Sequence, residues 1–402
     1  MTTDEIAARD RDADRGAFGA YIDRLKTGEL GALPVIFGLI VIGVVFYSQE
    51  SAFLSAFNLT NLALQISAVG ILSIGVVWVL LLGEIDLAIG SLSGLAAAVC
   101  VVSNLDGGVP GWLAIILGLA VGAGVGLAHG LIITMLRVPS FIVTLAGLIG
   151  WQGVLLYTLG SGGTRNITDD QILALTDTFF AAAVAWPIAI VLIGLLVGSD
   201  HWRRISRKRA GLVSEPFASM LIRHVIVGAA GIVAVAVFTS DRGLPLAVLI
   251  LLALVVIFDL VARRTQFGRH VFAVGGNPEA ARRAGINVER IRILVFVMSG
   301  AFAAAGGIMY ASRLLAVNQA SGSGSVLLLA IAGAVIGGTS LFGGRGTIYA
   351  ALLGALVLGS VANGIALLGL SSDFEFMITA AVLLAAVVVD ATARRGRQAS
   401  VR

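Results

Sequence analysis

Charged side chains are scarce in this chain. Only 12% of its 402 residues are Asp, Glu, Lys or Arg, whereas 58% are hydrophobic and the mean hydropathy is +0.99. A soluble domain carries about 25% charged residues, which cover its surface with groups that water solvates. The scarcity therefore excludes a soluble globular protein and indicates that lipid covers most of the surface.

Residues that bind metals or form disulfides are also few. The single cysteine, Cys100, lies in an apolar run, which excludes a disulfide framework and a thiolate metal site. The four histidines show no metal-ligand spacing, and we predict that His129 is a packed, hydrogen-bonded residue inside a span. No catalytic residue, metal site or bound cofactor is expected. The sequence also lacks a G-x-x-x-x-G-K-[ST] phosphate loop, so we do not expect this chain to hydrolyse ATP.

Long apolar runs take up most of the sequence. A membrane-crossing helix needs about 20 apolar residues. This window predicts an all-α bundle of about twelve transmembrane helices, or ten to twelve, because the very short turns at 83–87 and 342–346 could interrupt broken or re-entrant helices. The predicted spans are 33–49, 62–83, 87–105, 111–136, 141–159, 179–198, 222–239, 244–262, 293–312, 326–342, 346–370 and 374–391.

The basic residues predict the orientation of these spans. With the N-terminus inside, only Arg165, Arg242 and Arg313 of the 27 basic residues fall outside. This asymmetry follows the positive-inside rule and places both termini in the cytoplasm. Because the positive charge is spread along the inner loops, it does not indicate a nucleic-acid partner.

The same orientation predicts the domain organisation. We expect a cytoplasmic N-terminal segment at 1–32 without a cleavable signal peptide, a transmembrane domain at 33–392 and a cytoplasmic tail at 393–402. Within the transmembrane domain, 160–178 is a polar outer loop, 199–221 is a basic inner loop, and 263–292 is a longer inner loop with features of ordered structure.

Residues 275–287 of this inner loop have the signals of a complete short helix. Asn277 is a good N-cap, and Pro278 suits the first helical position. The acidic residue in the first turn and the arginines in the last complement the helix dipole. Gly285 is placed to end the helix in a left-handed conformation. The segment is therefore either a capped turn on the membrane surface or a docking element, with Ala280, Ala281 and Ala284 on its small face.

Three separated stretches carry a family resemblance. TQFGRHVFAVGGNPEAARRAGINVERIRILVFVMSG at 265–300 resembles the coupling-helix region of bacterial monosaccharide permeases of the ATP-binding-cassette (ABC) importers, in the ribose/xylose class. LLGEIDLAIGSLSGL at 81–95 and AIAGAVIGGTSLFGGRGTIYAALLGALVLGSVANGI at 330–365 resemble the same family in the same order. The resemblance covers most of the chain from about residue 58.

The resemblance implies a transport subunit of the bacterial plasma (inner) membrane rather than an enzyme. It implies a P-loop ATPase partner that holds ATP and Mg²⁺, an extracytoplasmic sugar-binding protein and a second permease copy, most simply a homodimer. It also implies that the inner-loop helix docks into the ATPase. The residues it assigns to this coupling are Gly276, Asn277, Pro278, Ala280, Ala281, Gly285 and Ile286.

The cargo implied by the resemblance is a monosaccharide. GEIDLAIGS at 83–91 is closer to xylose-type than to ribose-type permeases, although Ala88 stands where the family commonly carries Ser. Xylose or a related pentose is therefore expected. Ribose, galactose or a nucleoside remains an alternative, as do an ion-coupled secondary transporter and a membrane scaffold without transport.

Four residues are candidates for the translocation pathway. Glu84 and Asp86 are acidic residues in a short turn at the predicted cytoplasmic end of two spans, where they could line or gate the inner mouth. Gly338 and Thr339 belong to a glycine-rich turn that permits a broken helix beside a cavity. The structural alternatives are that Asp86 caps a helix beginning at Leu87 and that the glycines only allow tight packing.

Overall fold

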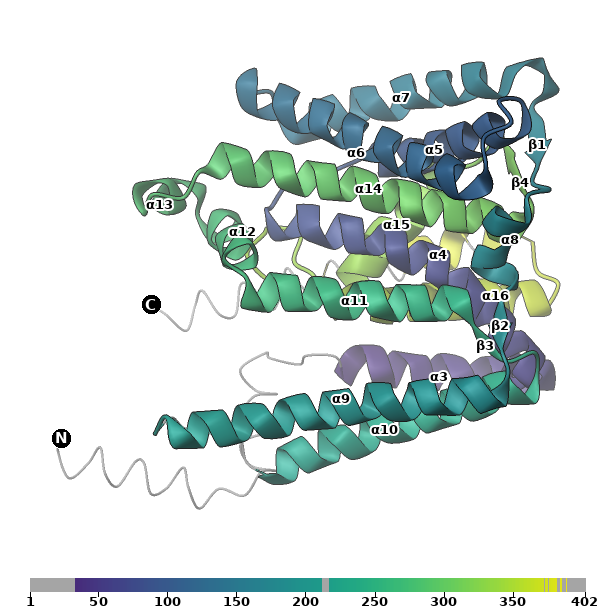
Figure 1. Ribbon diagram of the computed structural model, residues 1–402, viewed down its shortest axis with the longest axis vertical. Helices are drawn as coiled ribbons and strands as arrows, with labels where there is room; N and C mark the ends of the chain where they lie inside the picture. The colour runs from purple at the N-terminus through teal and green to yellow at the C-terminus, as the bar shows by residue number, and fades with distance from the viewer. Residues whose placement is uncertain are drawn as a thin grey trace. The chain divides into compact units, whose positions relative to one another are not determined.

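The structure is almost entirely helical. The computed structural model describes residues 33–211 and 217–371, together with 373–374, 376–381, 384 and 388. Within these residues, eight helices are long and apolar enough to cross a membrane (Figure 1). They are α4 (Ala56–Leu81), α6 (Gly111–Met135), α7 (Ser140–Leu159), α9 (Ala182–Arg209), α10 (Phe217–Ser240), α11 (Leu246–Arg264), α14 (Val288–Leu314) and α16 (Tyr349–Leu367).

Shorter elements complete the described chain. Three shorter apolar helices are α3 (Leu33–Gln49), α5 (Ile89–Leu105) and α15 (Gly324–Ile336). The remaining elements are α8 (Asp170–Asp177), α12 (Gln266–Gly276), α13 (Pro278–Arg283), the 3₁₀ turns η1 (Ser51–Leu54) and η2 (Gly160–Gly162), and the strands β1 (Thr164–Asn166), β2 (Phe179–Phe180), β3 (Leu244–Pro245) and β4 (Ala316–Asn318).

The helices agree with the predicted all-α, multi-pass architecture. Eleven of the predicted spans coincide with α3 to α7, α9 to α11 and α14 to α16. The remaining span, 374–391, falls largely outside the described residues. The total of twelve crossings therefore stays a prediction, and eight is the number that helix length supports.

The chain divides into two compact units, of which the smaller contains α9 and α10. These helices form an antiparallel hairpin in which Asp200 Oδ2 accepts from Arg223 Nη2 at 2.7 Å and lies 3.1 Å from His224 Nε2. The expectation of a loop beginning at 199 was wrong, because α9 continues to Arg209. Its basic run can remain helical because cations at a helix C-terminus interact favourably with the helix dipole.

The larger unit is built around α4 and α14. In α4, 94% of the most apolar 18-residue window is buried, compared with 28% in α6, 22% in α7 and 28% in α11. Helices α11, α14, α15 and α16 pack against α4. The position of α4 in the bundle interior leaves the apolar outer faces of α6, α7 and α11 for lipid.

Close backbone contact joins α14 to α6. Glycines recur every four residues along one face of α6, and a Cβ atom at Gly122 or Gly126 would overlap the carbonyl oxygen of Gly300 or Phe296. The pairs run in opposite directions along the two helices, which therefore pack antiparallel. Small residues at such spacing let helices approach closely in a membrane, where dispersion contacts rather than the hydrophobic effect hold them together.

One end of the larger unit carries its short strands and α8. Strand β1 pairs antiparallel with β4, with Arg165 opposite Val317. Helix α8 packs on α14 through a hydrogen bond of 2.8 Å between the hydroxyls of Thr176 and Ser312. The predicted outer loop 160–178 therefore contains η2, β1 and α8. In Figure 1, α12 and α13 lie at the opposite end of this unit.

Helix α15 is too short to cross a bilayer by itself. Its 13 residues span about 20 Å, compared with a hydrocarbon thickness of about 30 Å. An irregular turn at 337–348 follows before α16 begins. This is the interrupted helix that the glycine cluster allows.

The α6–α14 contact predicts a contrast between two glycines of the same helix. Gly122→Ala forces a methyl group onto the backbone of α14 and should cost about 1–3 kcal/mol, as overpacking does. At Gly124 an added Cβ meets no described heavy atom within 4 Å, so Gly124→Ala should be neutral or stabilise the protein by up to about 1 kcal/mol. Thermal unfolding of the purified variants in detergent measures both effects. Equal melting temperatures would contradict this packing.

Candidate coupling site and inner mouth

The short helix predicted in the inner loop is present as α13. It spans Pro278–Arg283, and the side chain of Asn277 accepts a hydrogen bond of 2.9 Å from the backbone N–H of Ala280. Gly285 has a φ of +84° and ends the helix as expected. The N-cap, the proline at the first position and the closing glycine are thus confirmed.

The two faces of α13 differ in exposure. Ala281 is only 4% exposed and packs inward, whereas Ala280 and Ala284 are exposed. The backbone N–H of Ile286 donates to the carbonyl of Ala281 at 3.1 Å, which folds the following residues under the helix. Of Ala280 and Ala281, the two alanines assigned to coupling, Ala280 is therefore exposed to a partner and Ala281 packs inward and holds the helix in place.

An ion-pair bridge fixes α13 to the start of α14. The guanidinium of Arg282 lies 3.2 Å from the carboxylate of Glu279 in the same helix and 3.1 Å from that of Glu289 in α14. Each exposed pair contributes little energy alone, in the range of about 0–1 kcal/mol. Together with the short connection at 284–287, this bridge keeps α13 and α14 in a defined relation.

The turn between α4 and α5, residues 82–88, is held by α14. Asp86 is 7% exposed, and its carboxylate accepts hydrogen bonds from Ser299 Oγ of α14 at 2.8 Å and from the backbone N–H of Ala88 at 3.0 Å. Helix α5 begins at Ile89 rather than at Leu87. The N-cap of α5 is Ala88 rather than Asp86, so the capping alternative was wrong in its position. Asp86 instead accepts from the backbone N–H of Ala88 within the turn and binds this turn to α14.

Glu84 forms an ion pair that the sequence did not reveal. Its Oε1 lies 2.9 Å from Nη2 of Arg292 in α14, and the two side chains are 15% and 29% exposed. Arg292 was interpreted only as one of the basic residues that set the orientation. A signal was available, because a carboxylate beside a predicted span end is stabilised by a cationic partner, but the sequence does not show which arginine supplies it.

The glycine-rich turn after α15 packs against the end of α4. The backbone N–H of Gly344 donates to the carbonyl of Leu81 at 2.9 Å. Thr339 is 2% exposed, and its hydroxyl finds no hydrogen-bond partner among the described residues. Gly338 is exposed with a φ of +103°, a conformation that favours glycine. Its neighbour Thr339 is therefore buried against the bundle, while Gly338 faces outward.

The three sequence stretches that carry the family resemblance meet at one point. A Cβ atom at Gly275, in the last turn of α12, would overlap the carbonyl oxygen of Leu81 and lie 2.8 Å from the backbone nitrogen of Gly344. A Cβ atom at Gly343 would lie 2.6 Å from the carbonyl oxygen of Gly275 and 2.8 Å from the backbone nitrogen of Gly83. We call Gly83, Gly275, Gly343 and Gly344 the glycine junction. Only glycine permits such close backbone contact.

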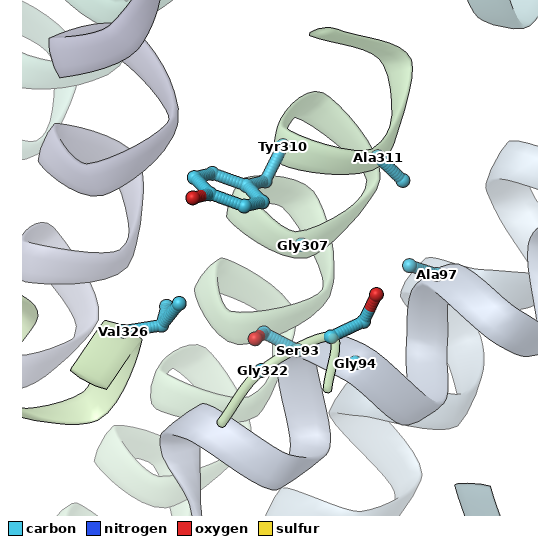
Figure 2. A pocket seen from close by; sticks show the side chains of 9 residues that line it. Ser93, Gly94, Ala97, Gly307, Tyr310, Ala311, Gly322 and Val326 are labelled. Atoms are coloured by element: carbon cyan, nitrogen blue, oxygen red, sulfur yellow. The ribbon is translucent and has the colours of Figure 1, made fainter. Parts of the chain in front are cut away.

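A small hollow lies farther along α5 and α14 (Figure 2). Its volume of about 10 Å³ accommodates a single water molecule, so a sugar cannot enter it as it stands. Helix α5 forms one wall of this hollow and also begins at the turn that Asp86 and Glu84 fix. The lining residues are Ser93, Gly94, Ala97, Gly307, Tyr310, Ala311, Ser321, Gly322 and Val326.

The histidine prediction is confirmed at its one intramembrane position. His129 is 4% exposed, and its Nε2 accepts a hydrogen bond of 2.9 Å from Trp151 Nε1. Across the described residues, no three His, Cys, Asp or Glu side chains are grouped closely enough to hold a metal ion.

These features define a polytopic α-helical membrane protein with a short capped helix outside its spans. The family described as "branched-chain amino acid transport system / permease component" matches residues 58–387. The chain therefore belongs to this permease family, as a multi-pass transport subunit and not an enzyme. The expected likeness to bacterial sugar permeases of the ribose/xylose class is confirmed.

Individual relatives are similar over nearly their whole length. The chain is 35% identical over 372 residues to the xylose transport system permease protein XylH of Escherichia coli (strain K12), covering 92% of this chain and 94% of the relative. It is 34% identical over 378 residues to XylH of Haemophilus influenzae, covering 92% and 99%. It is 32% identical over 356 residues to the ribose import permease protein RbsC of E. coli (strain K12), covering 88% and 92%. No solved structure matches the chain.

The contacts of Asp86 predict its effect on stability. Asp86→Ala leaves the hydroxyl of Ser299 and the N–H of Ala88 without their acceptor in a buried place, which should cost about 1–3 kcal/mol. Ser103→Ala in α5, the helix that follows the turn, removes only a hydroxyl that bonds to Cys100 of its own helix, and should cost less than about 0.5 kcal/mol. Thermal unfolding in detergent compares the two variants, and similar losses would contradict the role assigned to Asp86.

Proposed function

We propose that this chain is the permease subunit of an ATP-driven importer that carries xylose or a related pentose across the bacterial plasma membrane. The observation that carries the proposal is α13, a short capped helix with an exposed small face at one end of a membrane bundle. A membrane subunit without a phosphate loop cannot bind and hydrolyse ATP through that motif. It therefore needs a rigid element of this kind, through which the conformational change of a separate ATPase reaches its helices. Family membership supports the transport role, and the names of the relatives support the sugar.

The proposed topology has twelve spans and two cytoplasmic termini. It keeps 1–32 and 393–402 as cytoplasmic segments and 33–392 as the permease domain. The inner loop 263–292 then lies in the cytoplasm with α13, and the outer loop 160–178 faces the other side. The position of α13 and β1 at opposite ends of the larger unit supports this orientation (Figure 1), as does the positive-inside distribution of arginine.

In this proposal α13 enters a cleft of the P-loop ATPase. Ala280 provides the small exposed contact, while Asn277, Pro278 and Gly285 define the shape of the helix. Gly276 and Ile286 flank it, and both are at least partly exposed. Ala281 contributes from the inner side, by packing. ATP and Mg²⁺ belong to the ATPase, and the permease binds no cofactor.

Two further partners act on the membrane body. A sugar-binding protein delivers cargo to the outer end, where α8 and the β1–β4 pair form an ordered surface. A second copy of the permease completes the pathway. Glu84, Asp86, Gly338 and Thr339 form the inner mouth, which the ion pair and the buried carboxylate keep closed in this conformation.

The sugar is tested by uptake into proteoliposomes that contain the chain with its captured ATPase and the binding protein. We expect ATP-dependent accumulation of labelled xylose, with unlabelled xylose competing better than ribose or galactose. Uptake that needs no ATP and collapses with an uncoupler would contradict ATP-driven transport and favour ion coupling. Better competition by ribose would contradict only the assignment of the cargo.

Docking through α13 predicts a specific loss of ATPase capture. Ala280→Arg places a long charged side chain on the exposed small face and should weaken capture about tenfold or more, corresponding to about 1.4 kcal/mol. Ala210→Arg adds the same charge at an exposed alanine outside 263–292 and serves as the matched control. Co-purification from detergent measures both. Undiminished capture by the Ala280 variant would contradict docking through α13.

The same geometry makes Ala281→Arg a poor probe of docking. Because Ala281 is 4% exposed, an arginine there disrupts the packing of α13 before any partner is involved. Loss of capture in that variant would therefore not separate contact from folding.

A further inference from the structure

The two ends of the segment that carries α13 contact the last residue of α4 and the turn at 82–88 that follows it. Helix α12 precedes α13, and its last turn reaches the end of α4 through Gly275. Helix α14 follows α13, and its second turn reaches Glu84 through Arg292. A displacement of α13 therefore acts on one turn of the chain from two directions. This inference rests on the proposed function and identifies residues that act in it.

The contact through Gly275 is rigid. The Gly275 Cα packs directly on the carbonyl of Leu81, and that carbonyl also accepts the hydrogen bond from Gly344. Backbone atoms in such contact cannot yield by changing a rotamer, as side chains do. A displacement of the end of α12 therefore displaces α4 and the turn after α15 by nearly the same amount.

The contact through Arg292 can be broken. Its Nη2 binds Glu84, but its Nε is buried and has no hydrogen-bond partner in the described part of the chain. A buried donor without an acceptor raises the free energy of the arrangement that contains it. The guanidinium of Arg292 is therefore held by fewer hydrogen bonds than it could form. Small movements of α14 can then exchange the Glu84 bond for another arrangement at modest cost.

The turn at 82–88 is also hydrogen-bonded to α7. The backbone N–H of Ile85 donates to Ser140 Oγ at 3.4 Å, and Thr144 Oγ1 donates to the carbonyl of Ile85 at 3.3 Å. The turn therefore joins α7 to α12 and α14. Because α5 starts at the end of this turn and forms a wall of the hollow in Figure 2, movement of the turn changes the hollow as well.

We propose that Arg292 and Gly275 are coupling residues, which pass the movement of α13 to the turn at 82–88. The Arg292–Glu84 ion pair is the latch that keeps the inner mouth closed until α14 moves. Gly275 is the fixed contact about which the turn is displaced. Neither residue touches the ATPase, so both act after docking.

A charge exchange tests the latch. We would compare Glu84→Arg, Arg292→Glu and the double variant for ATPase capture, ATP hydrolysis and xylose uptake in proteoliposomes. Each single variant places like charges together, and we expect normal capture with uptake reduced about tenfold or more. The double variant restores an opposite-charge pair, and its uptake should return to within about threefold of the unmodified protein.

A second measurement reports on the turn without a partner. Hydrogen exchange of the purified chain should show faster exchange at the amides of Ile85 and Ala88 in each single variant, and restored protection in the double variant. Arg223→Glu reverses one charge of the pair between Arg223 of α10 and Asp200 of α9 and should leave exchange at the turn and uptake within about twofold.

Gly275→Ala tests the fixed contact, with Gly124→Ala as the matched glycine control. The added methyl group should leave capture intact while ATP hydrolysis no longer increases when the sugar-loaded binding protein is added. Normal stimulation in Gly275→Ala would overturn the role of Gly275.

The outcomes separate this inference from the function on which it rests. If the single charge reversals transport normally, or the double variant does no better than either single variant, the latch is wrong even though capture persists. If the unmodified chain captures no P-loop ATPase, the proposed function fails, and the coupling role fails with it.

Discussion

The close antiparallel contact between α6 and α14 is the constraint on which the rest of the larger unit depends. Within lipid, helices gain nothing from leaving water, so they associate through close packing and polar contacts. The glycines of α6 let the backbone of α14 approach until no side chain separates them. Once α14 is fixed on this side, its remaining faces are set against α4 and α5, and its two ends reach both α13 and β4.

This arrangement explains how a helical unit with a mostly apolar interior can respond to an event outside the membrane. Two polar contacts bind α14 to the 82–88 turn, Ser299 with Asp86 and Arg292 with Glu84. Apolar packing holds the helices together without selecting one register, whereas these directional bonds distinguish one position of α14 from another. The polar contacts thus define distinct positions of α14, between which a transporter can switch.

The membrane helices and α13 could be predicted from the sequence, for physical reasons. Apolar runs of span length predict membrane helices, and the signals at Asn277 and Gly285 are local, so α13 was predicted almost to the residue. Contacts between segments far apart in the sequence could not be predicted. Nothing local marks Arg292 as the partner of Glu84, or Gly275 as the glycine against Leu81, because both depend on how α12 and α14 pack. For the same reason Ala281 was assigned to an exposed face and proves to be buried.

Site-specific photo-crosslinking from α13 in native membranes tests the central claim most directly. A photoreactive residue at position 280 should form an adduct with a P-loop ATPase, because Ala280 lies on the exposed face. The same residue at the exposed position 210, outside the inner loop that carries α13, should form none. Absence of an ATPase adduct from position 280, in a chain that is inserted and folded, would contradict the claim that this helix receives the work of ATP hydrolysis.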